Sequence, residues 1–200
     1  MRWRWGDDPE LLRDCLAKHG VLGLPTESSY ALGVDPRDAE AVAAVFRAKG
    51  RAATEPLGVV VANADQAKAL GVDTDAEDYR WASSLWPAAL NVLLEVSKPL
   101  PAMSGAERLS VRIPEHSRLV ELLVQLRTGL TATSANSSGA PPIVDPAELD
   151  AFLASSGVPY CVVDDGVLPG GLPSTMVLWR ARSLRILREG RTEVAGLRKA

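Results

Sequence analysis

Residues 131–139 read Thr131-Ala132-Thr133-Ser134-Ala135-Asn136-Ser137-Ser138-Gly139, and they follow a short apolar run, Gly129-Leu130. Small hydroxyl and amide side chains hydrogen-bond readily to backbone or ligand, and they disfavour the interior of a helix or strand. Where such a run follows a strand of an α/β protein, it is placed to line a polar pocket. The composition fits a Ser-rich surface loop with a glycine turn equally well, so the rest of the chain must decide.

On either side of this stretch, apolar residues alternate between helical and extended spacing. Helices are expected at 9–19, 39–49, 65–70, 75–86, 114–126 and 146–154. Strands are expected at 21–24, 57–62, 91–96, 109–113, 130–133, 160–163, 175–179 and 184–187, with a loop at 25–33. This interleaving predicts a mixed α/β or α+β protein in which helices pack on a sheet.

The composition is that of a globular protein, with 46% hydrophobic and 24% charged residues among 200. A net charge of −3 argues against nucleic-acid binding driven by the overall electrostatic field. No run approaches the roughly 20 apolar residues of a membrane span, and the N-terminus lacks an apolar signal core. We expect one domain over residues 1–200, located in the cytoplasm without membrane contact.

The residues that commonly bind metals are sparse. Cys15 fits an amphipathic helix and Cys161 an apolar strand, so both are expected in the core. His19 and His116 form no cluster with them. No metal site made of protein side chains is predicted.

Three further polar elements stand beside predicted strands or helices. Thr26-Glu27-Ser28-Ser29 follows a strand and is typical either of a capped turn or of a ligand loop. Lys49-Gly50-Arg51 ends a helix, where its cations either offset the helix dipole or clamp phosphates. Arg112 lies within an apolar strand, and because a buried charge is costly unless paired, it is either a functional group or faces solvent.

Taken in chain order, these elements form a specific set. They are Thr26-Glu27 with Tyr30 and Leu32-Gly33, Lys49-x-Arg51 with Pro56-Leu57, Val111-Arg112-Ile113-Pro114 with His116, Ser134-Ala135-Asn136-x-Ser138-Gly139, Pro173-Ser174-Thr175, and Leu187-Arg188-x-Gly190. The set resembles the YrdC/Sua5 family of threonylcarbamoyl-AMP synthases over about residues 21–190. The chain is similar to the short, single-domain form of that family.

The resemblance implies an open, twisted, mixed sheet with flanking helices around a large, concave, basic cavity. It implies a nucleotidyltransferase that makes threonylcarbamoyl-AMP and pyrophosphate from L-threonine, bicarbonate and ATP with Mg²⁺. The product would pass to a tRNA-modifying transferase for N6-threonylcarbamoyladenosine at tRNA position 37, and RNA would be a possible further partner. Alternatives are a diverged relative using another amino acid or carbamoyl donor, or a non-catalytic module binding double-stranded RNA.

The resemblance also implies roles for individual residues. Thr26, Arg112 and Ser174 would bind threonine. Lys49 and Arg51 would be the catalytic cations on the ATP phosphates. The nucleotide would be held by Lys49, Arg51, Ser110, Thr133, Ser134, Asn136 and Arg188. Such chemistry needs positioning and charge neutralisation more than a nucleophile.

Three segments differ from the pattern that is usual in this family. Ser28-Ser29-Tyr30-Ala31 stands where Thr-Val-Tyr-Gly is usual, and Glu55 stands where a Lys precedes Pro-Leu. Ala88-Ala89-Leu90-Asn91 stands where Gly-Pro-Leu-Thr is usual. We expect any change of function to appear first on the phosphate side of the pocket.

Overall fold

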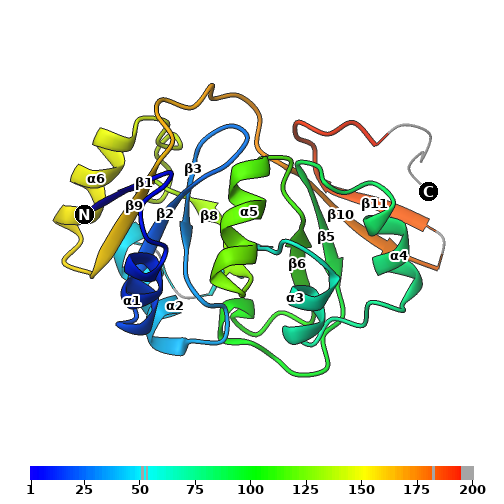
Figure 1. Cartoon of the computed structure of the whole chain (residues 1–200). Helices are drawn as coiled ribbons and strands as arrows, with labels where there is room; N and C mark the ends of the chain where they lie inside the picture. The colour runs from blue at the N-terminus through cyan, green and yellow to red at the C-terminus, as the bar shows by residue number, and fades with distance from the viewer. Residues whose placement is uncertain (51, 53, 182, 195–200) are drawn as a thin grey trace.

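The computed structural model describes residues 1–50, 52, 54–181 and 183–194. Its strands form two mixed sheets, and the helices pack around them (Figure 1). The predicted mixed α/β class is confirmed. The strands are divided between two sheets rather than joined in one. The stretch that was expected as one strand, 130–133, is itself split between the two sheets.

The first sheet has five strands in the order β1-β9-β2-β3-β8. They are β1 (Arg2–Arg4), β9 (Tyr160–Asp164), β2 (Val21–Pro25), β3 (Tyr30–Gly33) and β8 (Thr133–Ser134). The strands β2 and β3 form an antiparallel hairpin that closes at the pair Pro25 and Tyr30. The prediction of a loop over the whole of 25–33 was therefore wrong from Tyr30 onward, and only Thr26–Ser29 form the loop.

The second sheet has six strands in the order β11-β10-β5-β6-β4-β7. They are β11 (Ser183–Arg188), β10 (Thr175–Arg180), β5 (Leu90–Leu94), β6 (Leu109–Arg112), β4 (Val59–Val60) and β7 (Leu130–Thr131). The antiparallel pair β5 and β6 lies at the centre, with β10 parallel to β5. Because β10 and β11 follow β9 in the chain, a crossing from the first sheet to the second is required.

The two sheets meet at Ala132. Thr131 ends β7 in the second sheet and Thr133 begins β8 in the first. The Ala132 N–H donates at 2.7 Å to Gly58 O, just before β4 of the second sheet, while Thr131 Oγ1 accepts from the Val34 N–H just after β3. At this crossing a single residue separates the two sheets, and its neighbours are held from both sides.

Helices cover both sheets as the apolar patterns predict. They are α1 (Glu10–Ala17), α2 (Ala39–Lys49), α3 (Ala64–Ala69), α4 (Glu77–Ser83), α5 (Ser117–Leu126) and α6 (Pro146–Ser155), with a 3₁₀ turn η1 (Pro101–Met103). In β9, Val162 packs with α2 and α6, whereas Cys161 and Val163 pack with α1 and α5. The alternation of strand side chains thus buries both faces of the first sheet, and both cysteines lie in the core as predicted.

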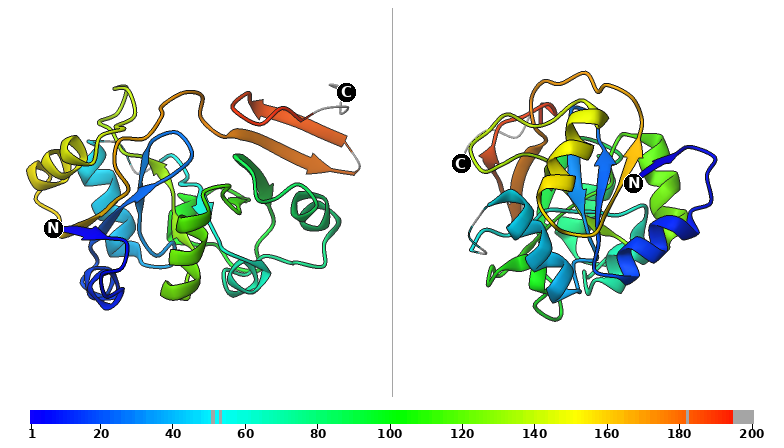
Figure 2. Two further views of the ribbon diagram at one scale, coloured as in Figure 1. Left: turned by 45° about the horizontal axis from the view of Figure 1, so that its top comes forward. Right: turned by 90° about the vertical axis from the view of Figure 1, so that its left-hand side faces the viewer.

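The connection between β9 and β10, which we call the 165–174 segment, runs from the first sheet over to the second (Figures 1 and 2). It is fastened to the β2–β3 hairpin at two points. Tyr30 Oη donates to Gly166 O at 2.8 Å and accepts from the Asp165 N–H, and the Gly170 N–H donates to Ser28 O. In the described part of the chain, every helix is too short or too polar to cross a membrane.

Candidate functional site

A cavity of about 550 Å³ lies where the two sheets meet. That volume is within the usual range for small-molecule sites. Its lining comes mainly from the Thr26–Ser29 loop with β3, the residues just before β4, the β7–β8 crossing, strands β5, β6 and β10, and the end of the 165–174 segment. The end of β11 and Arg191 after it complete the lining. Segments that are distant in sequence therefore line the same cavity.

Thr26 stands at the end of β2, where the hairpin loop begins. Its Oγ1 donates to Ser29 O at 2.7 Å, and its N–H bonds to the same carbonyl. The side chain is buried and lines the cavity. Because the hydroxyl hydrogen is used inside the loop, the oxygen lone pairs remain for a donor from a ligand.

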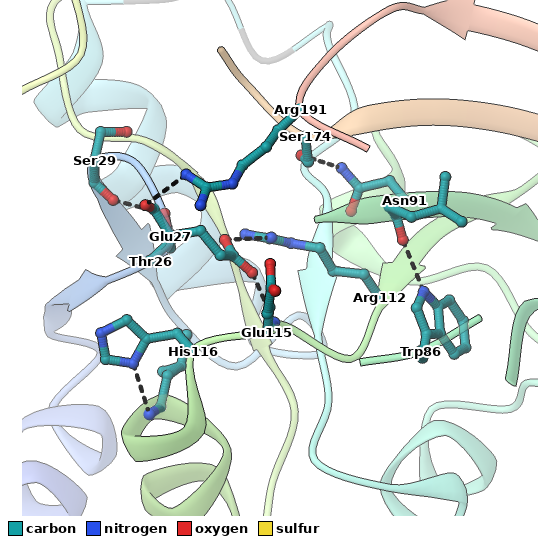
Figure 3. Close-up of polar contacts among 12 residues, drawn as sticks. Thr26, Glu27, Ser29, Trp86, Asn91, Arg112, Glu115, His116, Ser174 and Arg191 are labelled. Atoms are coloured by element: carbon teal, nitrogen blue, oxygen red, sulfur yellow. Dashed lines mark hydrogen bonds and ion pairs between the residues drawn. The ribbon is translucent and has the colours of Figure 1, made fainter. Parts of the chain in front are cut away.

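Arg112 ends β6 and is only 5% exposed. Its Nη1 donates to Glu27 Oε2 at 2.6 Å, and the other Glu27 oxygen accepts from the Glu115 N–H (Figure 3). Burial raises the pKa of Glu27, but the Arg112 cation and the hydrogen bonds from Arg112 and two backbone N–H groups bring it below its usual value. The sequence alternative in which Arg112 faces solvent is excluded.

The Arg112 guanidinium keeps further N–H groups for a ligand. Of its five donors, one bonds to Glu27, and none of the other residues that the structure describes accepts from the guanidinium. A guanidinium with an open edge matches a carboxylate or phosphate well. The pair therefore leaves a fixed anion-binding edge in the cavity.

Ser174 is held in place by groups from two neighbouring strands. Its Oγ accepts from Asn91 Nδ2 of β5 at 2.8 Å and from Arg188 Nη2 of β11 at 3.3 Å, and Arg188 also bonds to Ser174 O. A Cβ added to Gly190 would lie 2.2 Å from Pro173 O and 2.6 Å from the Thr175 backbone nitrogen. Only a glycine admits this close approach, so Gly190 fixes where Ser174 stands.

The Ser134–Gly139 run is fastened to the end of α2. Lys49 is 4% exposed, and its Nζ donates to Ser134 O, Asn136 O and Asn136 Oδ1. The Ser138 N–H donates to Lys49 O at 3.0 Å, and Ser134 Oγ donates to Asn136 Oδ1. Lys49 thus supports the loop from beneath in this structure.

The predicted site residues do not all line the cavity. Those that line the cavity are Thr26, Arg112, Thr133, Ser134, Ser174 and Arg188. Lys49 and Asn136 lie within the loop network next to it, and Ser110 is buried behind the lining with no partner for its Oγ among the described residues. Arg51 lies outside the described residues. The roles assigned to all of these residues stay predictions.

Sequence reasoning missed three residues that line the cavity. Glu27 was quoted but given no role, Asn91 lies in a segment noted only for its difference from the family, and Arg191 follows the last motif. Arg191 Nη1 donates to Glu27 O at 3.3 Å. A signal existed for Asn91, since a polar residue in an otherwise apolar strand is costly unless it has a partner.

The charge in the cavity is mixed. Arg112, Arg188 and Arg191 contribute cations, and Glu27 and Glu55 contribute carboxylates. Desolvation and the nearby Arg112 cation lower the pKa of Arg188 below its ordinary value. Because Glu27 is paired with Arg112, the remaining arginines favour an anionic ligand. No group of three His, Cys, Asp or Glu residues suited to a metal occurs among the described residues.

Known proteins resemble this chain in sequence and in fold. The family model Sua5_yciO_yrdC, described as "Telomere recombination", matches residues 14–190. The chain is 31% identical over 160 residues to a threonylcarbamoyl-AMP synthase of Pyrococcus abyssi, covering 78% of this chain and 46% of that protein. It is 29% identical over 182 residues to one of Bacillus subtilis, covering 86% and 50%. The chain thus spans about half the length of these relatives.

Two solved structures share the fold. P. abyssi Sua5 complexed with L-threonine matches with a TM-score of 0.80 and 26% identity over 95% of this chain and 57% of that one. E. coli YciO matches with a TM-score of 0.79 and 20% identity over 98% of both chains. Since the family model matches residues 14–190, which is most of the chain, this protein belongs to the Sua5/YciO/YrdC family.

Proposed function

We propose that this protein is a threonylcarbamoyl-AMP synthase, which converts L-threonine, bicarbonate and ATP into threonylcarbamoyl-AMP, pyrophosphate and water. The observation that carries the proposal is the buried Arg112 with its open guanidinium edge, placed in one cavity with Thr26 and Ser174. Relatives named as this synthase, and one relative complexed with L-threonine, support it.

The amino-acid end of the site follows from the donors and acceptors present. The threonine carboxylate would take the open edge of Arg112, whose orientation Glu27 fixes. Thr26 Oγ1 has lone pairs for a substrate N–H, because its own hydrogen bonds to Ser29 O. With the carboxylate and amine held, the amine attacks the carbon of bicarbonate or CO₂ and forms a carbamate. Holding both partners removes much of the entropic barrier.

The nucleotide end would lie along Thr133, Ser134 and Arg188. A carbamate oxygen attacks the α-phosphorus of ATP, the bond to the β-phosphate oxygen breaks, and pyrophosphate leaves. Arginine cations would offset the charge on the phosphates, and Mg²⁺ would arrive as part of the MgATP substrate. Lys49, Arg51, Ser110 and Asn136 are the further nucleotide-binding candidates.

The product is a mixed anhydride, which needs an acceptor. We place this protein ahead of a transferase that moves the threonylcarbamoyl group to the N6 nitrogen of adenosine 37 in tRNA. A reconstituted reaction of this protein with such a transferase and unmodified tRNA is expected to add the threonylcarbamoyl mass to the tRNA. Failure in this reaction alone would contradict the downstream assignment and leave the synthase proposal standing.

The synthase proposal is tested by pyrophosphate release. Purified protein with MgATP, bicarbonate and L-threonine is expected to release pyrophosphate and to form threonylcarbamoyl-AMP, detected by mass spectrometry. Omitting threonine or bicarbonate should abolish both signals. If high enzyme concentrations give no threonine-dependent pyrophosphate, the proposal is wrong. If another amino acid gives a larger signal than threonine, the protein is a diverged enzyme of the same family.

A further inference from the structure

Asn91 occupies the centre of the second sheet, between residues of its two neighbouring strands. It is 7% exposed, and it is the register partner of Met176 on β10. On the other side, Val92 pairs with Val111, so the next step along the antiparallel ladder brings Asn91 beside Arg112 (Figure 3). The side chains of Asn91, Met176 and Arg112 all line the cavity. Asn91 is therefore next to the proposed carboxylate-binding arginine.

The hydroxyl of Ser174 can still donate one hydrogen bond. A hydroxyl oxygen has two lone pairs and one hydrogen. Asn91 Nδ2 and Arg188 Nη2 both donate to Ser174 Oγ, which occupies the lone pairs. Ser174 Oγ donates to none of the residues that the structure describes. Its hydrogen is thus left for a ligand in the cavity.

The carbonyl oxygen of Asn91 has the opposite capacity. Its amide nitrogen is committed to Ser174, while Asn91 Oδ1 accepts from none of the described residues. Among the described residues, Asn91 Oδ1 is not one of the unpaired side-chain atoms that are closed off from solvent, so a ligand in the cavity can reach it. An accessible acceptor on a largely buried side chain is satisfied by water until a ligand arrives, so a ligand that displaces the water must supply a donor in its place.

We propose that Asn91 Oδ1 and the Ser174 hydroxyl together bind the side-chain hydroxyl of the amino-acid substrate, and so make Asn91 a specificity-determining residue. The substrate hydroxyl accepts from Ser174 and donates to Asn91. This inference rests on the proposed function, since it assumes an amino acid whose carboxylate takes Arg112.

The substrate's other polar groups fit this pair poorly. A carboxylate has no hydrogen to give to Asn91 Oδ1. The reacting amine must keep its lone pair for the attack on carbon, and a hydrogen bond from Ser174 would occupy that lone pair. A hydroxyl both gives and accepts, so it satisfies both partners without cost to the reaction.

The test compares L-threonine with L-2-aminobutyrate, which is threonine without its hydroxyl. Titration calorimetry on the full chain should show wild type binding threonine about 100-fold more tightly, because loss of the hydroxyl leaves two buried partners unpaired. Asn91→Leu should reduce this ratio to below about threefold, through weaker threonine binding with little change for 2-aminobutyrate. Ser174→Ala should lower the ratio as well, and it provides the same test should Asn91→Leu fail to fold.

Control and outcomes separate this inference from the synthase proposal. Ser97→Ala removes a hydroxyl outside this cavity and should keep the wild-type ratio. A full ratio in both Asn91→Leu and Ser174→Ala, or equal losses for both amino acids, would overturn the hydroxyl pair even if pyrophosphate is released. Threonine binding with the expected ratios but without pyrophosphate release would contradict the synthase proposal alone. If neither threonine nor 2-aminobutyrate binds, both the hydroxyl pair and the synthase proposal are overturned.

Discussion

At the level of single residues, Arg112 and Glu27 form the buried ion pair on which the proposed binding of the substrate carboxylate depends. Their side chains are 7% and 6% exposed, so each charge depends on the other. Removing one partner of such a buried pair costs about 3–5 kcal/mol, because the remaining charge is left without compensation. Loss of either side chain should therefore affect both the stability of the fold and the binding of an anion.

Arg112→Ala is expected to reduce kcat/KM for threonine by about 100-fold, because the carboxylate loses a charge-assisted hydrogen bond in a buried site. It should also lower the free energy of unfolding by about 3–5 kcal/mol. Steady-state pyrophosphate release and urea unfolding measure the two effects. Arg80→Ala, at an exposed position of α4, is the control and should change neither. Unchanged threonine use by Arg112→Ala would refute the carboxylate role.

The lowered pKa of Glu27 predicts how stability depends on pH. A carboxyl whose folded-state pKa lies below its unfolded value near 4.5 stabilises the fold above that value. The contribution is lost as pH falls through the lowered folded-state pKa. The wild type should therefore lose stability more steeply with acid than Glu27→Gln, measured by urea unfolding from about pH 6 to about pH 3. Parallel curves for the two proteins would show that Glu27 does not titrate as described.

At the scale of elements, the end of β11 positions Ser174 through Gly190. Gly190→Ala would place a Cβ against the backbone of Pro173 and Thr175, which cannot move aside as a side chain can. We expect threonine affinity to fall at least tenfold because Ser174 and Arg188 shift together. Calorimetry with threonine measures this effect. Glu189→Ala, at an exposed neighbouring position, should bind as wild type does, and equal affinities for all three proteins would contradict the positioning role.

The end of α2 supports the Ser134–Gly139 run through Lys49. Lys49→Met leaves Ser134 O, Asn136 O and Asn136 Oδ1 without their shared donor. We expect a loss of about 2–4 kcal/mol in unfolding free energy and faster amide exchange at Ser138, whose N–H bonds to Lys49 O. Lys68→Met, on an exposed face of α3, is the matched control. Unchanged exchange at Ser138 would show that the loop holds without Lys49.

At the scale of the whole molecule, the cavity takes its lining from both sheets and from the segment that connects them. A ligand that binds there should therefore stabilise both. At a concentration about 100 times its Kd, threonine or MgATP adds about 2.7 kcal/mol, which corresponds to a rise of roughly 5–10 °C in Tm for a chain of this size.

Hydrogen exchange with and without threonine provides the spatial part of that prediction. Protection should appear together at the Thr26–Ser29 loop and around Ser174, although they belong to different sheets. Protection of one without the other would show that the ligand does not span the junction. L-2-Aminobutyrate serves as the comparison, since it should protect the Ser174 region less.

Much of the fold follows from local patterns. The long helices α2 and α5 are predicted because apolar residues recur at helical spacing. The structure adds their N-caps, Asp38 and His116, and begins α5 at Ser117 rather than at 114. The strand β3 was missed because Ser28, Ser29 and Gly33 suggest a turn, whereas Tyr30 and Leu32 are buried by α2 and α6. The strand β1 was missed because Arg2–Arg4 is too short to show a period, and its pairing with β9 decides it.

The family, the mixed α/β class and the small polar motifs to which we assign the chemistry can be recognised from the sequence, because each is encoded in neighbouring residues. Which side chains meet depends on how the distant segments pack. Glu27 and Arg112 are 85 residues apart in the chain, and Asn91 and Ser174 are 83 apart. Local propensity carries no information about such pairs, because the change of sheet at Ala132 and the register of β5 between β6 and β10 create them.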